Sequence, residues 1–314
     1  MARAVAAPTL AKRRRSGLAR QEALFGYLFL LPWLIGLTVF VAIPILGAVL
    51  LSFTPYSLGR PVTFNGVDNY VRAFTNDAQF YNAIQRTFTW ALSYIPLAVG
   101  GALMTALLLN QGLKATNVFR TIFFLPHLVP IVASVYIWTY LLNPKYGLIN
   151  EALFRLTHID PGPGWFASKE WALPSLVLLA LWGAIGGNMM LIFLAGLQGV
   201  PKDLYEVAEL DGANALHRFW HITLPMISPT VFFNLVLGII GALSSFSNAF
   251  VATTGGPAYS TWLYALHIYQ TGFQFSELGY ACALAMIFFV ILTILTVAQF
   301  QLQKRWVYYA GEVK

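Results

Sequence analysis

The chain has 314 residues, of which 58% are hydrophobic and only 10% charged, and its formal net charge is +7. A soluble domain of this composition would have too little polar surface to cover itself, so the composition excludes an ordinary globular protein and indicates a lipid bilayer. Membrane topology and anionic lipid headgroups account for the excess of basic residues, so no nucleic-acid partner is expected.

The chain begins with a basic segment, residues 1–24, ahead of a long apolar run. This order resembles a secretory signal, but the run is about twice the usual length of a signal's apolar region and no small-residue cleavage site follows it. We therefore expect a retained first membrane span.

Six segments without Asp, Glu, Lys or Arg are long enough to cross the hydrocarbon core, which takes about 20 helical residues. The sequence thus predicts an all-α integral membrane protein with six transmembrane helices, at residues 25–53, 87–113, 121–144, 171–201, 222–253 and 278–303. The fifth apolar run continues to residue 266, but Gly255-Gly256-Pro257 interrupts it, so its span is predicted to end near Thr253.

The basic residues predict the orientation of these spans. With the N-terminus in the cytoplasm, 13 of the 19 lysines and arginines lie on the cytoplasmic side. The positive-inside rule then places both termini and the loop of residues 202–225 in the cytoplasm. The predicted organisation is a cytoplasmic segment (1–24), a membrane domain (25–303) and a cytoplasmic tail (304–314).

The loop of residues 202–225 is a charged segment between two apolar runs. Pro201 and the acidic residues that follow it predict a short helix, because proline suits the first turn and carboxylates favour the positive helix end. Asp211-Gly212 predicts a turn, and residues 213–221 a second short helix. Glu206 and Asp211 are expected to orient the two helices through charged hydrogen bonds. His217 and His221 lack a third ligand nearby, so no metal site is expected.

This loop resembles the EAA loop of permease subunits in binding-protein-dependent ABC importers, whose pattern is E-A-A-x-x-D-G-A, then Phe, then I-T-L-P. The matching residues, to which the resemblance gives a role in ATPase coupling, are Glu206, Ala208, Asp211, Gly212, Ala213, Phe219 and Pro225. Val207 replaces the first alanine. The similarity to sugar-importer permeases, and to the larger permease of the maltose transporter, extends over residues 30–305. It includes a G-x-x-N-Y element at 66–70 and the Gly-Gly-Pro at 255–257.

The resemblance implies a bacterial or archaeal plasma membrane, a set of partners and a mechanism. A second homologous permease would complete the pathway, two ATP-binding cassette ATPase subunits would dock beneath, and an extracellular substrate-binding protein would deliver the substrate. ATP and Mg would bind at the ATPase subunits. The sequence itself contains no G-x-x-x-x-G-K-[ST] phosphate loop and no hydrolase motif, so we expect a non-catalytic subunit that binds no cofactor.

Ionisable residues are assigned to loops and span ends, whereas ion-coupled carriers usually place such groups at membrane depth. This favours an ATP-driven importer over an ion-coupled secondary carrier or a channel, which is the alternative. His127, between Pro126 and Pro130, is predicted to be a buried, hydrogen-bonded histidine rather than a proton shuttle. Cys282, the single cysteine, is predicted to pack as a small hydrophobe.

Polar and aromatic residues within the spans are the candidates for a substrate pathway, namely Trp182 and Asn188 in the fourth span and Ser244, Ser245 and Asn248 in the fifth. Hydrogen bonds between helices are the alternative role for each of them. Uncharged polar groups beside an aromatic ring suit a neutral di- or oligosaccharide, whereas a phosphate usually requires a basic residue or a helix N-terminus. Glycerol phosphate and other solutes stay open, because a partner permease can supply charge. Residues 260–273, uncharged and aromatic, predict a helix at headgroup level.

Overall fold

The structure of the chain, a computed structural model, describes residues 17–57, 59, 61–112, 114–158 and 162–309. Most of the predicted N-terminal segment and the end of the C-terminal tail lie outside these residues. The helices are α1 (Gly17–Leu37), α2 (Ile43–Leu51), α3 (Asp68–Thr75), α4 (Ala78–Leu109), α5 (Thr116–Leu128), α6 (Ile131–Leu141), α7 (Leu148–Thr157), α8 (Ala172–Ala184), α9 (Asn188–Gln198), α10 (Lys202–Leu210), α11 (Ala215–Arg218), α12 (Leu224–Met226), α13 (Ser228–Leu243), α14 (Ser247–Thr253), α15 (Tyr264–Tyr269) and α16 (Leu278–Gln303). π-Helical turns at Thr38–Ala42, Phe219–Thr223 and Gln270–Gln274 continue neighbouring helices, and a 3-10 turn spans Trp165–Ala167.

Three helices of the described part are long and apolar enough to cross a membrane, at Arg20–Leu51, Ala78–Leu109 and Leu278–Gln303. Three bent pairs pass the same test together: α5 with α6, bent by 92°, α8 with α9, bent by 47°, and Ala215–Met226 with α13, bent by 67°. If each pair counts as one span, the chain has up to six, which is the number predicted from the sequence.

Proline and glycine explain where the bends lie. Pro130, directly before α6, has no N–H to continue the helix from α5. Between α8 and α9, a Cβ added to Gly186 would lie 1.8 Å from the carbonyl oxygen of Phe123. Only glycine therefore lets the backbone of α5 approach this junction so closely.

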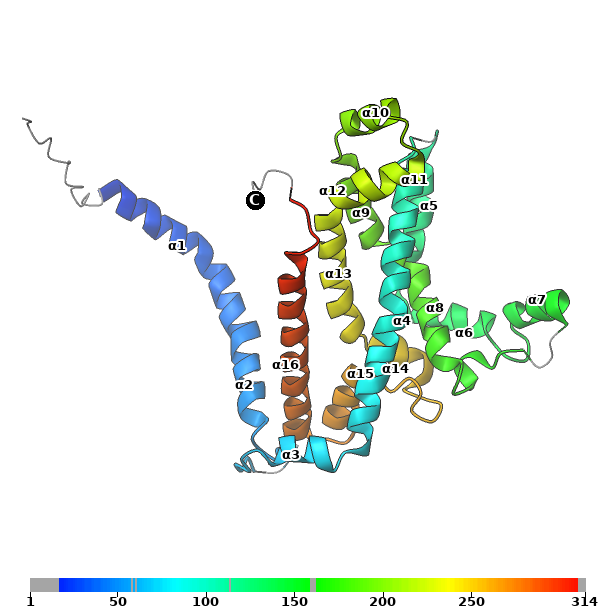
Figure 1. Cartoon of the computed structure of the whole chain (residues 1–314). Helices are drawn as coiled ribbons and strands as arrows, with labels where there is room; N and C mark the ends of the chain where they lie inside the picture. Colours follow the sequence, from blue (N-terminus) through cyan, green and yellow to red (C-terminus); the bar gives the residue numbers. More distant parts are fainter. Residues whose placement is uncertain (1–16, 58, 60, 113, 159–161, 310–314) are drawn as a thin grey trace, which may run out of the picture.

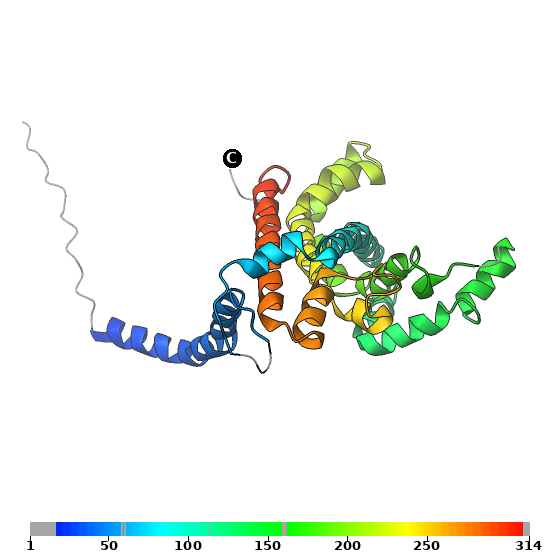
Figure 2. The ribbon, with the colours of Figure 1, turned by 90° about the horizontal axis from the view of Figure 1, so that it is seen from below.

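Helix α4 forms the centre of the packing, against α8, α9, α13 and α15. Trp90, buried in the core, donates from Nε1 to the carbonyl oxygen of Ala242, 3.0 Å away. By contrast, the helix that contains α1 and α2 has no buried residue in its most apolar stretch, and it meets the rest of the chain mainly where α2 packs on α16. Figures 1 and 2 show α1 leaving the bundle on one side and α6 and α7 on the other.

The second long helix begins at residue 78, nine residues before the predicted start of its span. The Asp77 carboxylate caps it, accepting from the backbone N–H groups of Gln79 and Phe80 at 2.8 and 3.1 Å. An N-cap of this kind satisfies free donors of the first turn, so the helix extends beyond its apolar part. As a result, Arg86 lies inside α4.

Asp77 also joins three helices. It accepts hydrogen bonds from the Tyr280 hydroxyl at 2.6 Å and from His267 Nε2 at 2.9 Å. Because Trp262 Nε1 donates to His267 Nδ1, the ring proton of His267 lies on Nε2. Burial raises the pKa of the Asp77 carboxyl, but the hydrogen bonds from His267 and Tyr280 outweigh it and hold that pKa well below its ordinary value of 3.8.

Residues 260–273 are partly helical, as predicted, through α15 and the π-helical turn that follows it, and part of the segment packs in the protein core. Tyr264 and Leu266 of α15 are fully buried, and Trp262 is nearly so. The Tyr264 hydroxyl donates to the carbonyl oxygen of Leu284 in α16, 3.0 Å away. Trp262 and Tyr264 therefore pack in the core, where their polar atoms find protein partners, whereas Phe273 at the end of the segment is 71% exposed.

We expect Asp77→Asn to lower the Tm of the purified protein at neutral pH. We also expect the Tm of this variant to change less than that of the wild type as the pH falls. Because the folded-state pKa of Asp77 is depressed, its stabilisation is present above pH 3.8 and is lost as the pH falls through the folded pKa. Thermal unfolding measured from about pH 6 to pH 3 tests this, with the exposed Asp68→Asn as control. The same acid-induced loss of Tm in wild type and Asp77→Asn would contradict it.

Candidate functional site

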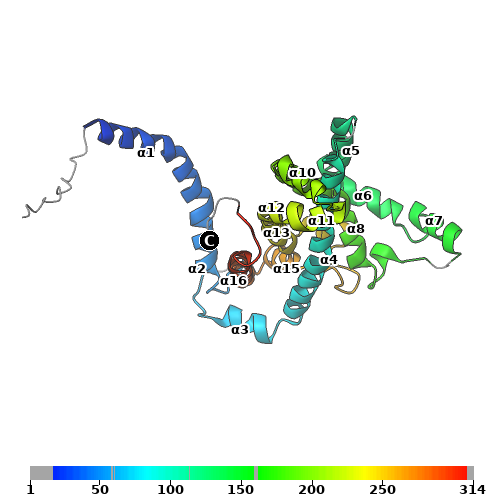
Figure 3. The same ribbon diagram turned by 45° about the horizontal axis from the view of Figure 1, so that its top comes forward.

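Two short helices, α10 and α11, lie at one end of the molecule, beside the end of α4 and the start of α5 (Figures 1 and 3). They confirm the predicted pair of helices in the loop of residues 202–225. The second helix begins at Ala215 rather than at residue 213, because Asn214 is its N-cap and accepts from the N–H of His217 at 2.8 Å. It continues through the π-helical turn Phe219–Thr223 into α12 and ends at Met226.

The turn between the two helices requires glycine. Gly212 has a φ of +80°, in the left-handed region that residues with a side chain rarely adopt. Its N–H donates to the carbonyl oxygen of Glu209 at 3.0 Å, and the N–H of Ala213 donates to that of Ala208 at 2.9 Å. These bonds satisfy carbonyl groups at the end of α10 and set the direction of the chain into α11.

Side chains tie the two helices together, but not those that the sequence indicated. Glu209 forms an ion pair with Arg218, and the Tyr205 hydroxyl lies 2.9 Å from Thr223 Oγ1. The prediction that Glu206 and Asp211 orient the helices is wrong: both are exposed, and neither carboxylate forms a hydrogen bond within the described part of the chain. The two carboxylates are therefore free to meet another protein.

The exposed face of this pair is apolar as well as charged. Leu210 is 89% exposed, and the other large exposed apolar residues are Leu204, Val207, Leu216 and Trp220. Phe219 and Pro225 are half-buried. These exposed apolar residues were not identified from the sequence. The position of Leu210 directly before the predicted Asp211-Gly212 turn could have indicated that its side chain is exposed. Such a surface suits a protein partner.

Two adjoining cavities, of about 270 and 260 Å³, lie among the central helices and share Tyr94, Ala180 and Asn248. The first is also lined by Trp182, His127 and Ser134, and the second by Trp90, Ser245 and Met189 among others. No acidic residue, lysine or arginine lines either cavity.

Three of the five pathway candidates line these cavities, namely Trp182, Ser245 and Asn248. Asn188 and Ser244 line neither and are exposed at helix ends. The Oδ1 atom of Asn248 is buried without a hydrogen-bond partner. No hydrogen bond therefore fixes this amide oxygen, and a rotation of the side chain towards the cavity would break no hydrogen bond of that oxygen.

The prediction of a buried His127 is wrong, because the side chain is exposed and lines the first cavity. It lies in the last turn of α5, just before the bend at Pro130, and its ring packs beside Gly187 at the α8–α9 junction. Tyr94 was missed altogether. Its ring stacks on that of Trp90, with centroids 5.2 Å apart and planes 4° apart, and this i, i+4 aromatic pair in α4 was the available signal.

The histidine rings of α11 and the following turn, His217 and His221, stack with centroids 4.2 Å apart. Across the residues that the structure describes, no group of three or more His, Cys, Asp or Glu side chains is placed to hold a metal ion.

Comparison with known proteins agrees with this arrangement. Residues 95–308 match the family described as binding-protein-dependent transport system inner membrane component. The probable ABC transporter permease protein YesP of Bacillus subtilis (strain 168) is 38% identical, over 95% of this chain and 96% of its own length. The lactose transport system permease protein LacF of Rhizobium radiobacter is 32% identical, over 93% and 98%.

A solved structure shows the same fold. It is that of a bacterial alginate ABC transporter in complex with an alginate pentasaccharide-bound periplasmic protein. One of its chains superposes with a TM-score of 0.81 at 23% identity, covering 93% of this chain and 98% of that one. Because the family match and these relatives extend over most of the sequence, the chain belongs to the inner membrane components of binding-protein-dependent transport systems, the permeases of ABC importers.

Proposed function

We propose that this chain is one permease subunit of an ABC importer for a neutral di- or oligosaccharide, and that the two adjoining cavities are its part of the substrate pathway. The observation that carries the proposal is their lining, which offers aromatic rings, hydroxyls and an amide but no fixed charge. Aromatic faces and uncharged hydrogen-bonding groups suit sugar rings. A lactose permease among the relatives and an alginate importer of the same fold support a saccharide substrate.

The contact sites for sugar are Trp182, Ser245 and Asn248. The earlier candidates Asn188 and Ser244 would act only in another state of the transporter, since they lie outside both cavities. His127 and Tyr94 join the proposed site, because each lines a cavity that includes Asn248. Without a membrane-depth carboxylate or lysine in the cavities, an ion-coupled carrier has less support than an ATP-driven importer.

The proposed assembly contains a second homologous permease, two ATPase subunits and an extracellular substrate-binding protein. ATP and Mg would bind only at the ATPase subunits, and this chain would hold no cofactor and catalyse no reaction. The exposed Leu210, Leu216 and Trp220 beside charged residues support ATPase docking on α10 and α11. The helix of α1 and α2 has no buried residue in its most apolar stretch, and in this proposal the second permease covers part of that surface and lipid the rest.

Coupling residues in this proposal are those of the matched loop. Gly212 and Ala213 form the turn, Ala208 closes it, and Glu206 and Asp211 present free carboxylates to the ATPase subunit. Phe219 and Pro225 transmit movement to α13, so that ATP hydrolysis switches the pathway between outward and inward access.

For the membrane we propose six spans in a multi-pass plasma-membrane protein, with residues 1–24, the 202–225 loop and residues 304–314 in the cytoplasm. Residues 25–303 form the membrane domain. The excess of basic residues on this side supports the orientation.

Cysteine labelling tests this topology. In a Cys282→Ala background, Ala167→Cys should react with an impermeant thiol reagent added outside intact cells, because it is exposed in the loop before α8. Lys202→Cys, exposed at the start of α10, should react only after the membrane is opened. Labelling of Lys202→Cys from outside, with Ala167→Cys protected, would overturn the orientation.

The function itself is tested with the complex purified through a tag on this chain and reconstituted in proteoliposomes. We expect uptake of a neutral di- or oligosaccharide that requires ATP inside and the sugar-loaded binding protein outside. Calorimetry of that binding protein against a sugar panel identifies the substrate. Uptake driven by a proton or sodium gradient without ATP would assign the chain to the secondary carriers instead.

A further inference from the structure

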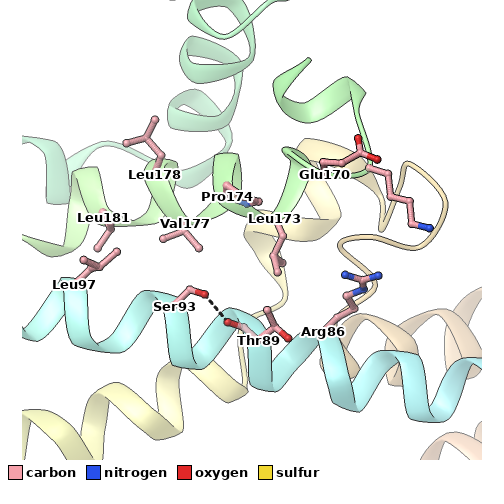
Figure 4. A pocket seen from close by; sticks show the side chains of 11 residues that line it. Arg86, Thr89, Ser93, Leu97, Glu170, Leu173, Pro174, Val177, Leu178 and Leu181 are labelled. Carbon is pink, nitrogen blue, oxygen red and sulfur yellow. Dashed lines mark hydrogen bonds between the residues drawn. The ribbon is translucent and has the colours of Figure 1, made fainter. Parts of the chain in front are cut away.

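A third and larger groove, of about 690 Å³, lies between α4 and α8 (Figure 4). Its lining residues from α4 are Arg86, Thr89, Ser93 and Leu97, and those from α8 and the loop before it are Lys169, Glu170, Leu173, Pro174, Val177, Leu178 and Leu181. Figure 4 shows Arg86 and Glu170 at one end of the groove and Leu97 and Leu181 at the other. The groove therefore has a charged end and an aliphatic shaft.

The shaft differs in chemistry from the two cavities proposed for sugar. Apart from two hydroxyl residues, its lining is aliphatic, and no aromatic ring or amide side chain contributes. The Ser93 hydroxyl is already satisfied, because it donates to the carbonyl oxygen of Thr89 at 2.8 Å. Such a surface favours a hydrocarbon chain and gives a sugar ring nothing to stack on.

The charged end favours an anion. Arg86 Nε is buried without a hydrogen-bond partner, and Lys169 is exposed beside it in the lining, against the single carboxylate of Glu170. No guanidinium nitrogen of Arg86 forms a hydrogen bond or ion pair within the described part of the chain, so where Arg86 lines the groove its N–H groups favour a ligand that brings acceptor oxygens.

The depth of this end matches that of lipid headgroups. Arg86 directly precedes the charge-free stretch that begins at residue 87, and Lys169 lies two residues before the stretch that begins at residue 171. Trp171, at that boundary, is 43% exposed. Tryptophan rings favour the interface between headgroups and hydrocarbon.

We propose that this groove binds one anionic phospholipid, with the headgroup on Arg86 and Lys169 and one acyl chain along the shaft to Leu97 and Leu181. The lipid would lie in the membrane leaflet on the side opposite α10 and α11. The proposal depends on this chain spanning the membrane, and on no other part of the proposed function. Since α4 and α8 pack directly on each other, the groove is a slot between touching helices. A helix about 10 Å wide does not enter such a slot, whereas an acyl chain does.

Native mass spectrometry of the complex in nanodiscs of phosphatidylglycerol or phosphatidylcholine tests the proposal. We expect the wild-type complex to retain phosphatidylglycerol in preference to phosphatidylcholine. The double variant Arg86→Gln with Lys169→Gln should lower that preference by roughly tenfold or more, because each cation contributes to anionic-lipid binding. Lys145→Gln with Arg155→Gln is the matched control, since both are exposed basic residues that do not line the groove. Equal retention in the two double variants would overturn the proposal.

Leu97→Trp provides a second test that leaves the charges intact. Leu97 is 54% exposed, so the fold tolerates the larger tryptophan side chain, whose indole ring would fill the shaft. We expect it to reduce retention of both lipids, and unchanged retention would exclude the shaft as the acyl-chain site.

A photo-crosslinking residue in place of Leu178 identifies the occupant directly. We expect a lipid adduct, whereas an adduct with another protein subunit would assign the groove to the permease interface and overturn the lipid site. These measurements do not depend on sugar transport, so a failure of the proposed transport function would leave their outcome unchanged.

Discussion

Replacing Gly212 by valine is expected to abolish ATP-driven uptake while the chain still inserts and assembles. Gly212 has a φ of +80° and open space around its Cα, so valine is opposed by the backbone conformation rather than by a clash. A strained left-handed residue costs about 1 to 3 kcal/mol, which the isolated turn relieves by changing its direction. Because this turn sets α11 against α10, the docking face would be misplaced and stimulation of ATP hydrolysis by the loaded binding protein lost.

The matched control is Gly112→Val. Gly112 follows α4, has a φ of +67° and also has open space, but it lies outside the α10–α11 pair. The two variants therefore carry similar backbone strain, and only the first changes the coupling loop. Uptake and stimulated ATPase activity in proteoliposomes should stay near wild type for Gly112→Val. Equal losses in both variants would indicate a general folding defect, and normal stimulation in Gly212→Val would remove the loop from coupling.

The bounds of a membrane helix were predictable from the sequence where the length of its apolar run alone determines them. The last helix has the predicted bounds, residues 278–303, because charged or polar residues end the apolar run on both sides. The start of α4 was not predictable from hydropathy, since Asp77 caps a helix whose first turns precede the apolar stretch. Pro130 and Gly186 marked the bends in the sequence, but the angles of 92° and 47° depend on packing between distant helices.

The candidate site was predictable to the extent that its residues are close in sequence. The turn at Gly212 follows from local chemistry. The ion pair does not, because Glu206 and Glu209 both suit α10, and only the direction of the turn decides that Glu209 meets Arg218. Tyr94 lines the cavities from α4, which is more remote in the chain: its i, i+4 spacing from Trp90 indicates a stacked pair, but not that the pair borders a cavity formed with α8 and α14.

Replacing Asn248 by leucine is expected to weaken sugar binding while the complex stays assembled. The amide lines both cavities, and its Oδ1 atom is buried without a partner, so it is free to accept from a sugar hydroxyl after a small rotation. Loss of such a hydrogen bond costs about 1 to 3 kcal/mol, or roughly fivefold to 150-fold in Kd. Equilibrium binding of radiolabelled sugar to the purified complex measures this directly, and uptake in proteoliposomes should fall with it.

Asn234→Leu separates a substrate contact from the general effect of removing an unpaired amide. Asn234 also has a buried Oδ1 atom without a partner, but it is fully buried in α13 and lines neither cavity. Its Nδ2 donates to the carbonyl oxygen of Met189, 3.3 Å away, so leucine there should lower Tm and leave the Kd for sugar unchanged. A wild-type Kd and uptake rate in Asn248→Leu would make Asn248 a packing residue and move the sugar site away from these cavities. Weaker sugar binding confined to Asn248→Leu is the result that the cavity geometry requires, because only that amide borders the space in which a sugar ring would lie.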